Sequence, residues 1–187
     1  MANNCLIALG ANLPTSTRTP LELLEYALKV LEDESFDLTA VSRWYKSPAF
    51  PAGSGPDYIN GVAAIRTLKH ANDVLRRLNE IESELGRIRK DRWGARVCDL
   101  DLLTCNQEVL PDLETYTFWR GLPLKQQMSD VPTELILPHP RIQDRPFVLI
   151  PMRDVAPDWQ HPATGETIDD LIDALPSELL TEIEAAD

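Results

Sequence analysis

The fold and the chemistry of this chain are best read from residues 87–103, whose sequence is RIRKDRWGARVCDLDLL. The first ten of these residues carry five basic side chains, in a chain of 187 residues whose formal net charge is -12. The apolar residues that follow predict a strand over 97–103. Because side chains alternate across a strand, Asp99 and Asp101 are expected on one face, with Cα atoms about 6.5–7 Å apart. Two carboxylates this close, beside arginines, indicate Mg²⁺ carrying a phosphate chain.

The N-terminal part of the chain predicts a strand followed by a helix. Residues 5–9 form a short apolar run that ends at Gly10, as expected of a buried strand that feeds a loop. Thr19, Pro20 and Glu22 have the spacing of a capping box with proline at the first helical position. The apolar residues that then recur at helical spacing are Leu24, Ala27, Leu28 and Leu31.

The next hundred residues complete an alternating order of strands and helices. We expect strands over 36–46 and 58–68, separated by a loop over 47–56 that is rich in proline and glycine. A second amphipathic helix is expected over 74–85, with Gly86 just after its end. Together with the strand at 97–103, the order is β-α-β-β-α-β. This order predicts an α+β fold with a ferredoxin-like core, in which a mainly antiparallel sheet is layered with helices.

The part of the chain after the Asp99 strand is less regular. Residues 106–134 could form a β-ribbon, a flap near the site or an oligomer contact, and the sequence leaves these alternatives open. We expect this segment to pack on the surface beside the strand of Asp101 without supplying catalytic groups. Its aromatic side chains should be buried against the core or a second subunit, because they carry too much apolar area for solvent: Tyr116, Phe118 and Trp119. Residues 135–137 should return to the sheet, and helices are expected over 169–175 and 177–184. We treat residues 1–187 as a single domain.

Composition excludes several classes of protein. The acidic balance argues against general nucleic-acid binding, which needs a broad positive field. No apolar stretch approaches the length of a membrane span, and the first residues do not resemble a secretory signal. Cys5, Cys98 and Cys105 form no C-x-x-C pair, and two of them lie in predicted strands, where we expect free buried thiols in a cytoplasmic protein. Of the histidines, His70 is expected at a helix start and His161 in an exposed turn.

The motif R-x-G-x-R-x-x-D-L-D-L-L at residues 92–103 resembles the signature of the 6-hydroxymethyl-7,8-dihydropterin pyrophosphokinase family of folate biosynthesis. Three more segments resemble that family in the expected order: residues 7–13, 56–60 and 137–149. The resemblance covers about residues 5–158, and it is interrupted by 106–134, which is about twenty residues longer than the family's usual connection. Ala11 stands where the family usually has serine. Any one motif could arise by chance, whereas four in order are hard to explain otherwise.

The resemblance implies a role for each matching residue at the phosphate end of the site. It implies that Asp99 and Asp101 bind two magnesium ions and that ATP is the co-substrate. The residues it implies at the catalytic centre are Arg87, Arg96, Asp99 and Asp101. It places Arg89 and Trp93 in a lid that closes over ATP, and closure would exclude water as a competing acceptor. It makes His139 and Arg145 contacts of the nucleotide.

The resemblance also implies a pterin pocket, whose residues are Ser47, Pro48, Phe50, Tyr58, Asn60 and Phe147. A flat, electron-poor pterin suits aromatic faces on both sides, which Tyr58 and Phe147 could supply. Its amide-like edge suits a side chain that both donates and accepts hydrogen bonds, as Asn60 does. Apart from the resemblance, the same residues would be taken for ordinary core and turn positions.

The function that the resemblance implies is transfer of the β,γ-diphosphate of ATP to the hydroxymethyl group of a reduced pterin, which leaves AMP. The expected partners are these two small molecules, with no nucleic acid and no membrane, and the expected state is a monomer or a weak homodimer. One alternative is a catalytically silent relative that binds nucleotide or pterin. A second is a small RNA-binding domain, since ferredoxin-like sheets often bind RNA.

Overall fold

The fold was analysed in a computed structural model, which describes residues 1–49, 53, 55–85, 97–123, 126 and 129–186. Within these residues one sheet has the strand order β5-β1-β4-β3-β6, and β2 also pairs with β4. The strands are β1 (Asn3–Ala11), β2 (Phe36–Val41), β3 (Tyr45–Ser47), β4 (Tyr58–Thr67), β5 (Asp99–Cys105) and β6 (Glu184–Ala185). All of the pairings are antiparallel.

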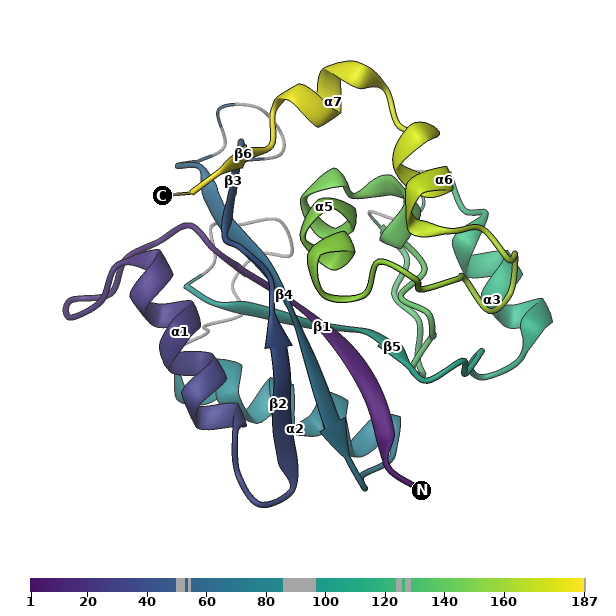
Figure 1. Ribbon diagram of the computed structural model, residues 1–187, viewed down its shortest axis with the longest axis horizontal. Coiled ribbons are helices and arrows are strands. Elements are labelled where there is room, and N and C mark those ends of the chain that lie inside the picture. The colour runs from purple at the N-terminus through teal and green to yellow at the C-terminus, as the bar shows by residue number, and fades with distance from the viewer. Residues whose placement is uncertain (50–52, 54, 86–96, 124–125, 127–128, 187) are drawn as a thin grey trace.

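Helices cover both faces of the sheet (Figure 1). Helices α1 (Pro20–Leu31) and α2 (Ala71–Glu84) lie on one face, and α5 (Pro146–Val155) with α6 (Ile168–Asp173) lies on the other. The remaining elements are α3 (Leu113–Arg120), the 3₁₀ turn η1 (Ile142–Asp144) and α7 (Ser177–Thr181). The elements from β1 to β5 follow the order β-α-β-β-α-β if β2 and β3 are counted as one interrupted strand, so the ferredoxin-like α+β prediction is confirmed.

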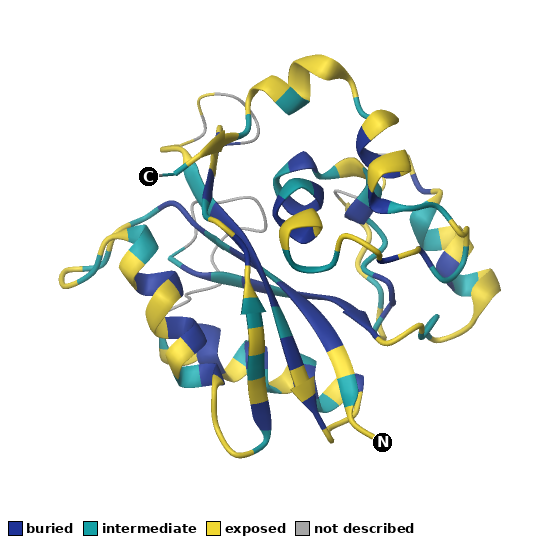
Figure 2. Cartoon of the chain, in the orientation of Figure 1, coloured by how far each residue is buried: buried dark blue, intermediate teal, exposed yellow. Residues whose placement is uncertain are grey.

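Two apolar cores explain why the sheet is buried on both faces. Cys5, Ile7 and Leu9 of β1 point into the core under α1 and α2, whereas Leu6 belongs to the core under α5 and α6. Figure 2 shows the result, with buried residues along the central strands and exposed residues on the outer sides of the helices. The predicted capping box of α1 is present: the Thr19 hydroxyl accepts from the backbone of Glu22, and the Glu22 carboxylate accepts from the backbone of Thr19.

The single strand predicted over 36–46 is wrong, because the structure has two strands there. The chain leaves the ladder at Ser42, whose backbone N–H donates to Val62 O at 2.9 Å while its hydroxyl accepts from Val62 N–H at 3.0 Å. Trp44 then packs its ring over Gly61, where an added Cβ would lie only 2.7 Å from the ring. The large side chain therefore fits at this point of the sheet because its neighbour in β4 has none.

Two further expectations about the C-terminal half need correction, and one alternative that the sequence left open is removed. Residues 135–137 do not rejoin the sheet, since Leu137 forms only an isolated bridge with Leu110. Residues 113–120 form helix α3 and not a β-ribbon, because Asp112 caps them by accepting from Thr115 N–H at 2.9 Å. The last predicted helix ends at Thr181, and β6 follows it and pairs with the exposed edge of β3.

The cysteine prediction is confirmed, and all three residues are free and buried. Cys5 and Cys105 face each other across β1 and β5, while Cys98 lies directly before β5. Among the described residues, no helix is both long and apolar enough to cross a membrane.

Candidate active site

The two aspartates of β5 share one face of the sheet, as the sequence predicted. Leu100 and Leu102 are buried in the core under α1 and α2, so alternation turns Asp99 and Asp101 to the side of α5. Both aspartates are partly exposed, unlike the leucines between and after them. In the neighbouring strand β1, Asp99 lies opposite Gly10 and Asp101 lies opposite Ala8.

Asp101 is the centre of a charged cluster that three segments build together. Arg145, the residue before α5, approaches it with Nη1 at 3.0 Å from Oδ2, and His139 Nε2 lies 3.9 Å from the same oxygen. His139 is held beside β5 because its backbone N–H donates to Leu103 O at 2.7 Å. The sequence predicted both side chains as nucleotide contacts, and the structure brings both to Asp101.

The His139 ring is neutral at neutral pH. Burial is the main cause that lowers its pKa from 6.5 to about 4. The positive charges of Arg145 and Arg141 lower the pKa further, whereas the Asp101 carboxylate acts in the opposite direction and raises it. Its Nδ1 accepts from the backbone N–H of Arg141 at 3.2 Å. The proton of the neutral ring is therefore on Nε2, the nitrogen that faces Asp101.

A second group of predicted residues lies further along the same face of the sheet. Asn60 of β4 is buried and donates from Nδ2 to the hydroxyl of Ser47 in β3, at 2.9 Å. Tyr58 lies two residues before Asn60 on the same face and opposite Ser47. Gly10 lies opposite Asn60 as well as Asp99, so one row of residues runs from Asp99 through Gly10 to Asn60. The two side chains are two strands apart, about 10 Å.

Gly10 leaves the space between these two groups open. A Cβ at this position would come to 3.5 Å from Asn60 Oδ1 and 3.9 Å from the Tyr58 ring, so any longer side chain would fill the row. Phe147 lies in the first turn of α5 and packs on the core of that face, with the Arg145 guanidinium 6.0 Å from its ring centroid. Pro48 is exposed directly after β3.

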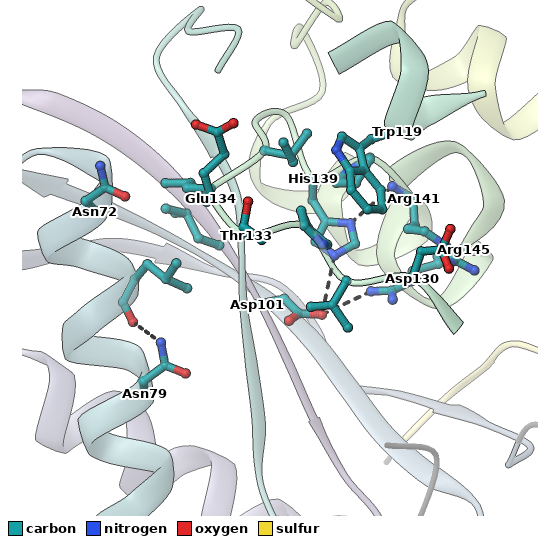
Figure 3. Close-up of a pocket in the computed structure, with 17 residues that line it drawn as sticks. Asn72, Asn79, Asp101, Trp119, Asp130, Thr133, Glu134, His139, Arg141 and Arg145 are labelled. Carbon is teal, nitrogen blue, oxygen red and sulfur yellow. Dashed lines mark hydrogen bonds and ion pairs between the residues drawn. The ribbon is translucent and has the colours of Figure 1, made fainter. Parts of the chain in front are cut away.

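A pocket of about 630 Å³ opens beside Asp101 (Figure 3). Helix α2 forms one side, with Asn72 and Asn79, and Trp119 lies on the other side with Asp101 between them. The complete lining is Asn72, Leu75, Asn79, Asp101, Leu102, Trp119, residues 130–136, His139, Pro140, Arg141 and Arg145.

Segment 106–134 lies beside the strand of Asp101, as expected, and it also borders the pocket. Trp119 and residues 130–134 line the pocket together with Asp101. The expected burial of the aromatics is met within this chain by Tyr116, which is 1% exposed, whereas Phe118 is 59% exposed and is not buried against the core. The unusual length of this segment and its aromatic side chains were the signals available from sequence, although they could not show which aromatic faces the pocket.

His161 was also placed wrongly, because it is buried and not in an exposed turn. Its Nε2 lies 2.5 Å from the Tyr116 hydroxyl, and its Nδ1 accepts from Ala163 N–H at 3.1 Å. The partner that buries it is 45 positions away in the sequence. The remaining predicted residues lie outside the described part of the chain: Phe50, Arg87, Arg89, Trp93 and Arg96.

The described donor set fits a magnesium ion that is shared with a phosphate chain. No group of three or more His, Cys, Asp or Glu residues that could enclose a metal occurs within the described ranges. Mg²⁺ is usually bound through one or two carboxylates plus substrate phosphates and water, and not through an all-protein cage. Asp99 and Asp101 supply those carboxylates on one partly exposed face.

Comparison with known proteins gives one family. The model of the family described as 7,8-dihydro-6-hydroxymethylpterin-pyrophosphokinase matches residues 6–157. A Synechocystis protein named 2-amino-4-hydroxy-6-hydroxymethyldihydropteridine pyrophosphokinase is 34% identical over 172 residues, which cover 91% of this chain and 75% of that protein. A protein of the same name from Pseudomonas aeruginosa is 34% identical over 187 residues, the full length of both chains.

Solved structures agree on the fold. A crystal structure of Plasmodium falciparum HPPK-DHPS has a TM-score of 0.71 and 13% sequence identity. The match covers 99% of this chain and 47% of that chain, so this chain spans about half of the longer protein.

Proposed function

The chain belongs to the 7,8-dihydro-6-hydroxymethylpterin-pyrophosphokinase family, and from that premise we propose how its own residues divide the reaction between them. The family activity is ATP-dependent diphosphate transfer in folate biosynthesis, and this chain is such a pyrophosphokinase. The acceptor is the hydroxymethyl group of 6-hydroxymethyl-7,8-dihydropterin, and the leaving product is AMP.

The phosphate end of the site is formed around Asp101. Asp99 and Asp101 would hold Mg²⁺, which when bound neutralises charge on the phosphate oxygens. The Arg145 guanidinium, 3.0 Å from Asp101, is close enough to contact a phosphate chain held at these carboxylates. Neutral His139 would donate from Nε2, and Arg87 and Arg96 are proposed to add positive charge. Two magnesium ions remain part of the proposal.

The acceptor end is formed around Asn60. The Asn60 amide, with Ser47 as its hydrogen-bonded neighbour, would bind the amide-like edge of the pterin. Tyr58 and Phe147 would cover its two faces, because one comes from the sheet and the other from α5 above it. Pro48 and Phe50 complete the proposed pterin contacts.

The proposed chemistry is an in-line attack between these two ends. The pterin hydroxyl oxygen attacks the β-phosphorus, and the bond between that phosphorus and the oxygen bridging to the α-phosphate breaks. The developing charge on the phosphate chain is offset by Arg145 and by the arginines of 87–96. Proximity supplies a large part of the acceleration, because the row from Asp99 to Asn60 fixes both substrates on one rigid sheet. Closure of Arg89 and Trp93 over ATP would keep water away from the transferred group.

One observation supports this division most directly, namely that the Asp99 and Asp101 carboxylates and the Asn60–Ser47 pair share one sheet face across the small residue Gly10. The test is release of AMP, measured by ion-exchange chromatography, with ATP, Mg²⁺ and the pterin present together. Omitting the pterin or chelating the metal should each abolish AMP release. Binding of ATP and pterin without any AMP would indicate the catalytically silent relative instead.

We also propose that residues 1–187 act as one domain, as a monomer or a weak homodimer in the cytoplasm. Free buried thiols support a reducing compartment. The net charge of -12 argues against a nucleic acid partner. Sedimentation at several protein concentrations tests the oligomeric state.

A further inference from the structure

Helix α3 is docked onto the C-terminal part of the chain through one of its faces. Tyr116 and Arg120 are four residues apart and therefore lie on the same side of the helix. The Tyr116 hydroxyl contacts His161 Nε2 at 2.5 Å, and Arg120 Nη2 contacts Glu166 Oε2 at 2.8 Å. His161 and Glu166 belong to one turn, since His161 N–H donates to Glu166 O at 2.8 Å.

This docking determines where the other aromatic side chains of α3 point. Phe118 is 59% exposed and has no part in the pocket lining, whereas its neighbour Trp119 is half-buried and lines the pocket beside Asp101. The two rings meet edge to face, with centroids 5.7 Å apart. Figure 3 shows Trp119 across the pocket from Asn72 and Asn79 of α2.

The pocket is too large and too apolar to serve the phosphate chain alone. Asp101 and Arg145 occupy one part of it, and its other lining includes Leu75, Leu135 and Ile136. A volume of about 630 Å³ lies in the range of sites that bind whole ligands of the size of a nucleotide. Aliphatic side chains cannot solvate phosphates, so they suit the uncharged nucleoside part of the same molecule.

We propose that Trp119, brought to the site by the docking of α3, is a nucleoside-contacting residue and sets the affinity of this enzyme for ATP. This inference rests on the proposed function, because it names the part of ATP that one wall of the pocket contacts. The indole presents a flat apolar surface to the base or ribose, at little cost in side-chain entropy. Under this proposal, segment 106–134, which is longer than the family's usual connection, supplies a contact to the substrate.

The test compares a triphosphate ligand that carries a nucleoside, α,β-methylene-ATP, with one that does not, inorganic tripolyphosphate. Their dissociation constants are measured by calorimetry with Mg²⁺ on the full chain. Trp119→Ala should weaken binding of the ATP analogue about tenfold, as expected for the loss of one aromatic contact with a base. Binding of tripolyphosphate should change less than about twofold, because that ligand has no nucleoside to lose.

Phe118→Ala is the matched control, because it removes the neighbouring aromatic from the same helix outside the pocket. It should leave both dissociation constants unchanged. If Trp119→Ala does not fold, as judged by circular dichroism, the same two ligands are compared on Trp119→Leu, which keeps a large apolar side chain but removes the aromatic ring. It should weaken the ATP analogue about threefold or more.

Two results would overturn the inference: an unchanged constant for the ATP analogue, or equal weakening of both ligands. They are separate from failure of the proposed function, which is judged on AMP release by the unmodified chain. Normal turnover together with unaltered ATP affinity in the Trp119 variants would reject the contact and leave the pyrophosphokinase activity standing.

Discussion

The charge of the phosphate end depends on a few side chains whose positions are mutually fixed. Asp101 lies within 3.0 Å of Arg145 Nη1, so without ligand the arginine already has a carboxylate beside it. In the proposed complex Asp101 would hold the cation, and Arg145 would then contact the phosphate oxygens. Under that proposal one carboxylate would both bind the cation and hold the guanidinium in place.

Asp101→Asn should remove most of the activity without unfolding the protein. Asparagine keeps the shape of the side chain but not the negative charge that a metal needs. We expect kcat to fall at least a hundredfold, about 3 kcal/mol in the transition state, at saturating ATP and Mg²⁺. AMP release gives kcat, and thermal unfolding reports the fold.

Asp37→Asn is the control for this substitution. Asp37 forms an exposed ion pair with Arg66, 2.6 Å apart, between β2 and β4 and away from the pocket. Exposed pairs of this kind contribute little to stability, so its kcat should match the unmodified protein. Retention of near-normal kcat by Asp101→Asn would reject the assignment of Asp101 to the metal.

Close packing between particular strands and helices places the two ends of the site. Strand β4 pairs with β1 along one edge and with two separate strands, β2 and β3, along the other. The second edge is divided in this way because Trp44 occupies the space over Gly61. Strand β3 places Ser47 beside Asn60, where the two side chains form a hydrogen bond. The Tyr45 hydroxyl of the same strand donates to Asp154 of α5 at 2.8 Å. The proposed pterin end is thereby tied to the helix that begins directly after Arg145 and carries Phe147.

Gly61→Ala should destabilise the fold through the Trp44 ring. The new Cβ would lie 2.7 Å from the ring, closer than real contacts allow, and the partly buried indole is packed against the core, so it cannot move away freely. Overpacking of this kind costs about 1–3 kcal/mol in the free energy of unfolding. Urea denaturation measures it. Gly10→Ala in the adjacent strand is the control for stability, because its Cβ would meet nothing closer than 3.5 Å. Equal stability of the two variants would argue against the packing explanation.

Tyr116→Phe should loosen α3 from the C-terminal turn. The ring is kept, but the hydroxyl that lies 2.5 Å from His161 Nε2 is lost, so a buried N–H has no acceptor. The cost is about 1–3 kcal/mol in the free energy of unfolding. Urea denaturation again gives the value. Tyr26→Phe is the comparison, because Tyr26 is an exposed tyrosine of α1 and its variant should differ from the unmodified protein by less than about 0.5 kcal/mol. Identical losses in the two variants would contradict the role of the hydrogen bond.

The molecule as a whole is a sheet between two helical layers, and α3 docks on the C-terminal turn through buried polar groups. His161 is one of these groups. Burial, the largest cause, and the charge of Arg120 lower its pKa from 6.5 to about 4, so it is neutral in the folded protein above that pH. The unfolded chain keeps the ordinary histidine value.

Stability should therefore fall as the pH falls from about 6.5 to about 4. In this window the unfolded chain binds a proton at His161 that the folded protein does not, so acid favours unfolding. Each group of this kind contributes about 1.4 kcal/mol per pH unit, up to about 3 kcal/mol across the window. His161→Gln should lower the slope of the unfolding free energy against pH by the contribution of one group. Urea denaturation at several pH values measures this slope. Tyr116→Phe, which keeps the titrating ring, should lower the whole curve without changing its slope. Parallel curves for His161→Gln and the unmodified protein would reject the assignment.

The order of the elements up to the Asp99 strand and the shared face of its two aspartates were predictable from sequence because both depend on local patterns. Period-two alternation places Asp99 and Asp101 on one face whatever lies around them, and the capping box at Thr19 closes within four residues. Buried free cysteines likewise follow from residue type. The resemblance in four short segments then led to the correct family.

Contacts between distant parts of the chain were decided only by the tertiary structure. Tyr116 buries His161 across 45 positions, and Trp44 divides a strand only because Gly61 lies opposite it. The direction of Trp119 likewise depends on how α3 docks, and no periodicity within eight residues of helix encodes that docking. Local spacing gives the face of a strand or helix on which a side chain lies, whereas packing free energy, summed over residues remote in sequence, determines what that face meets.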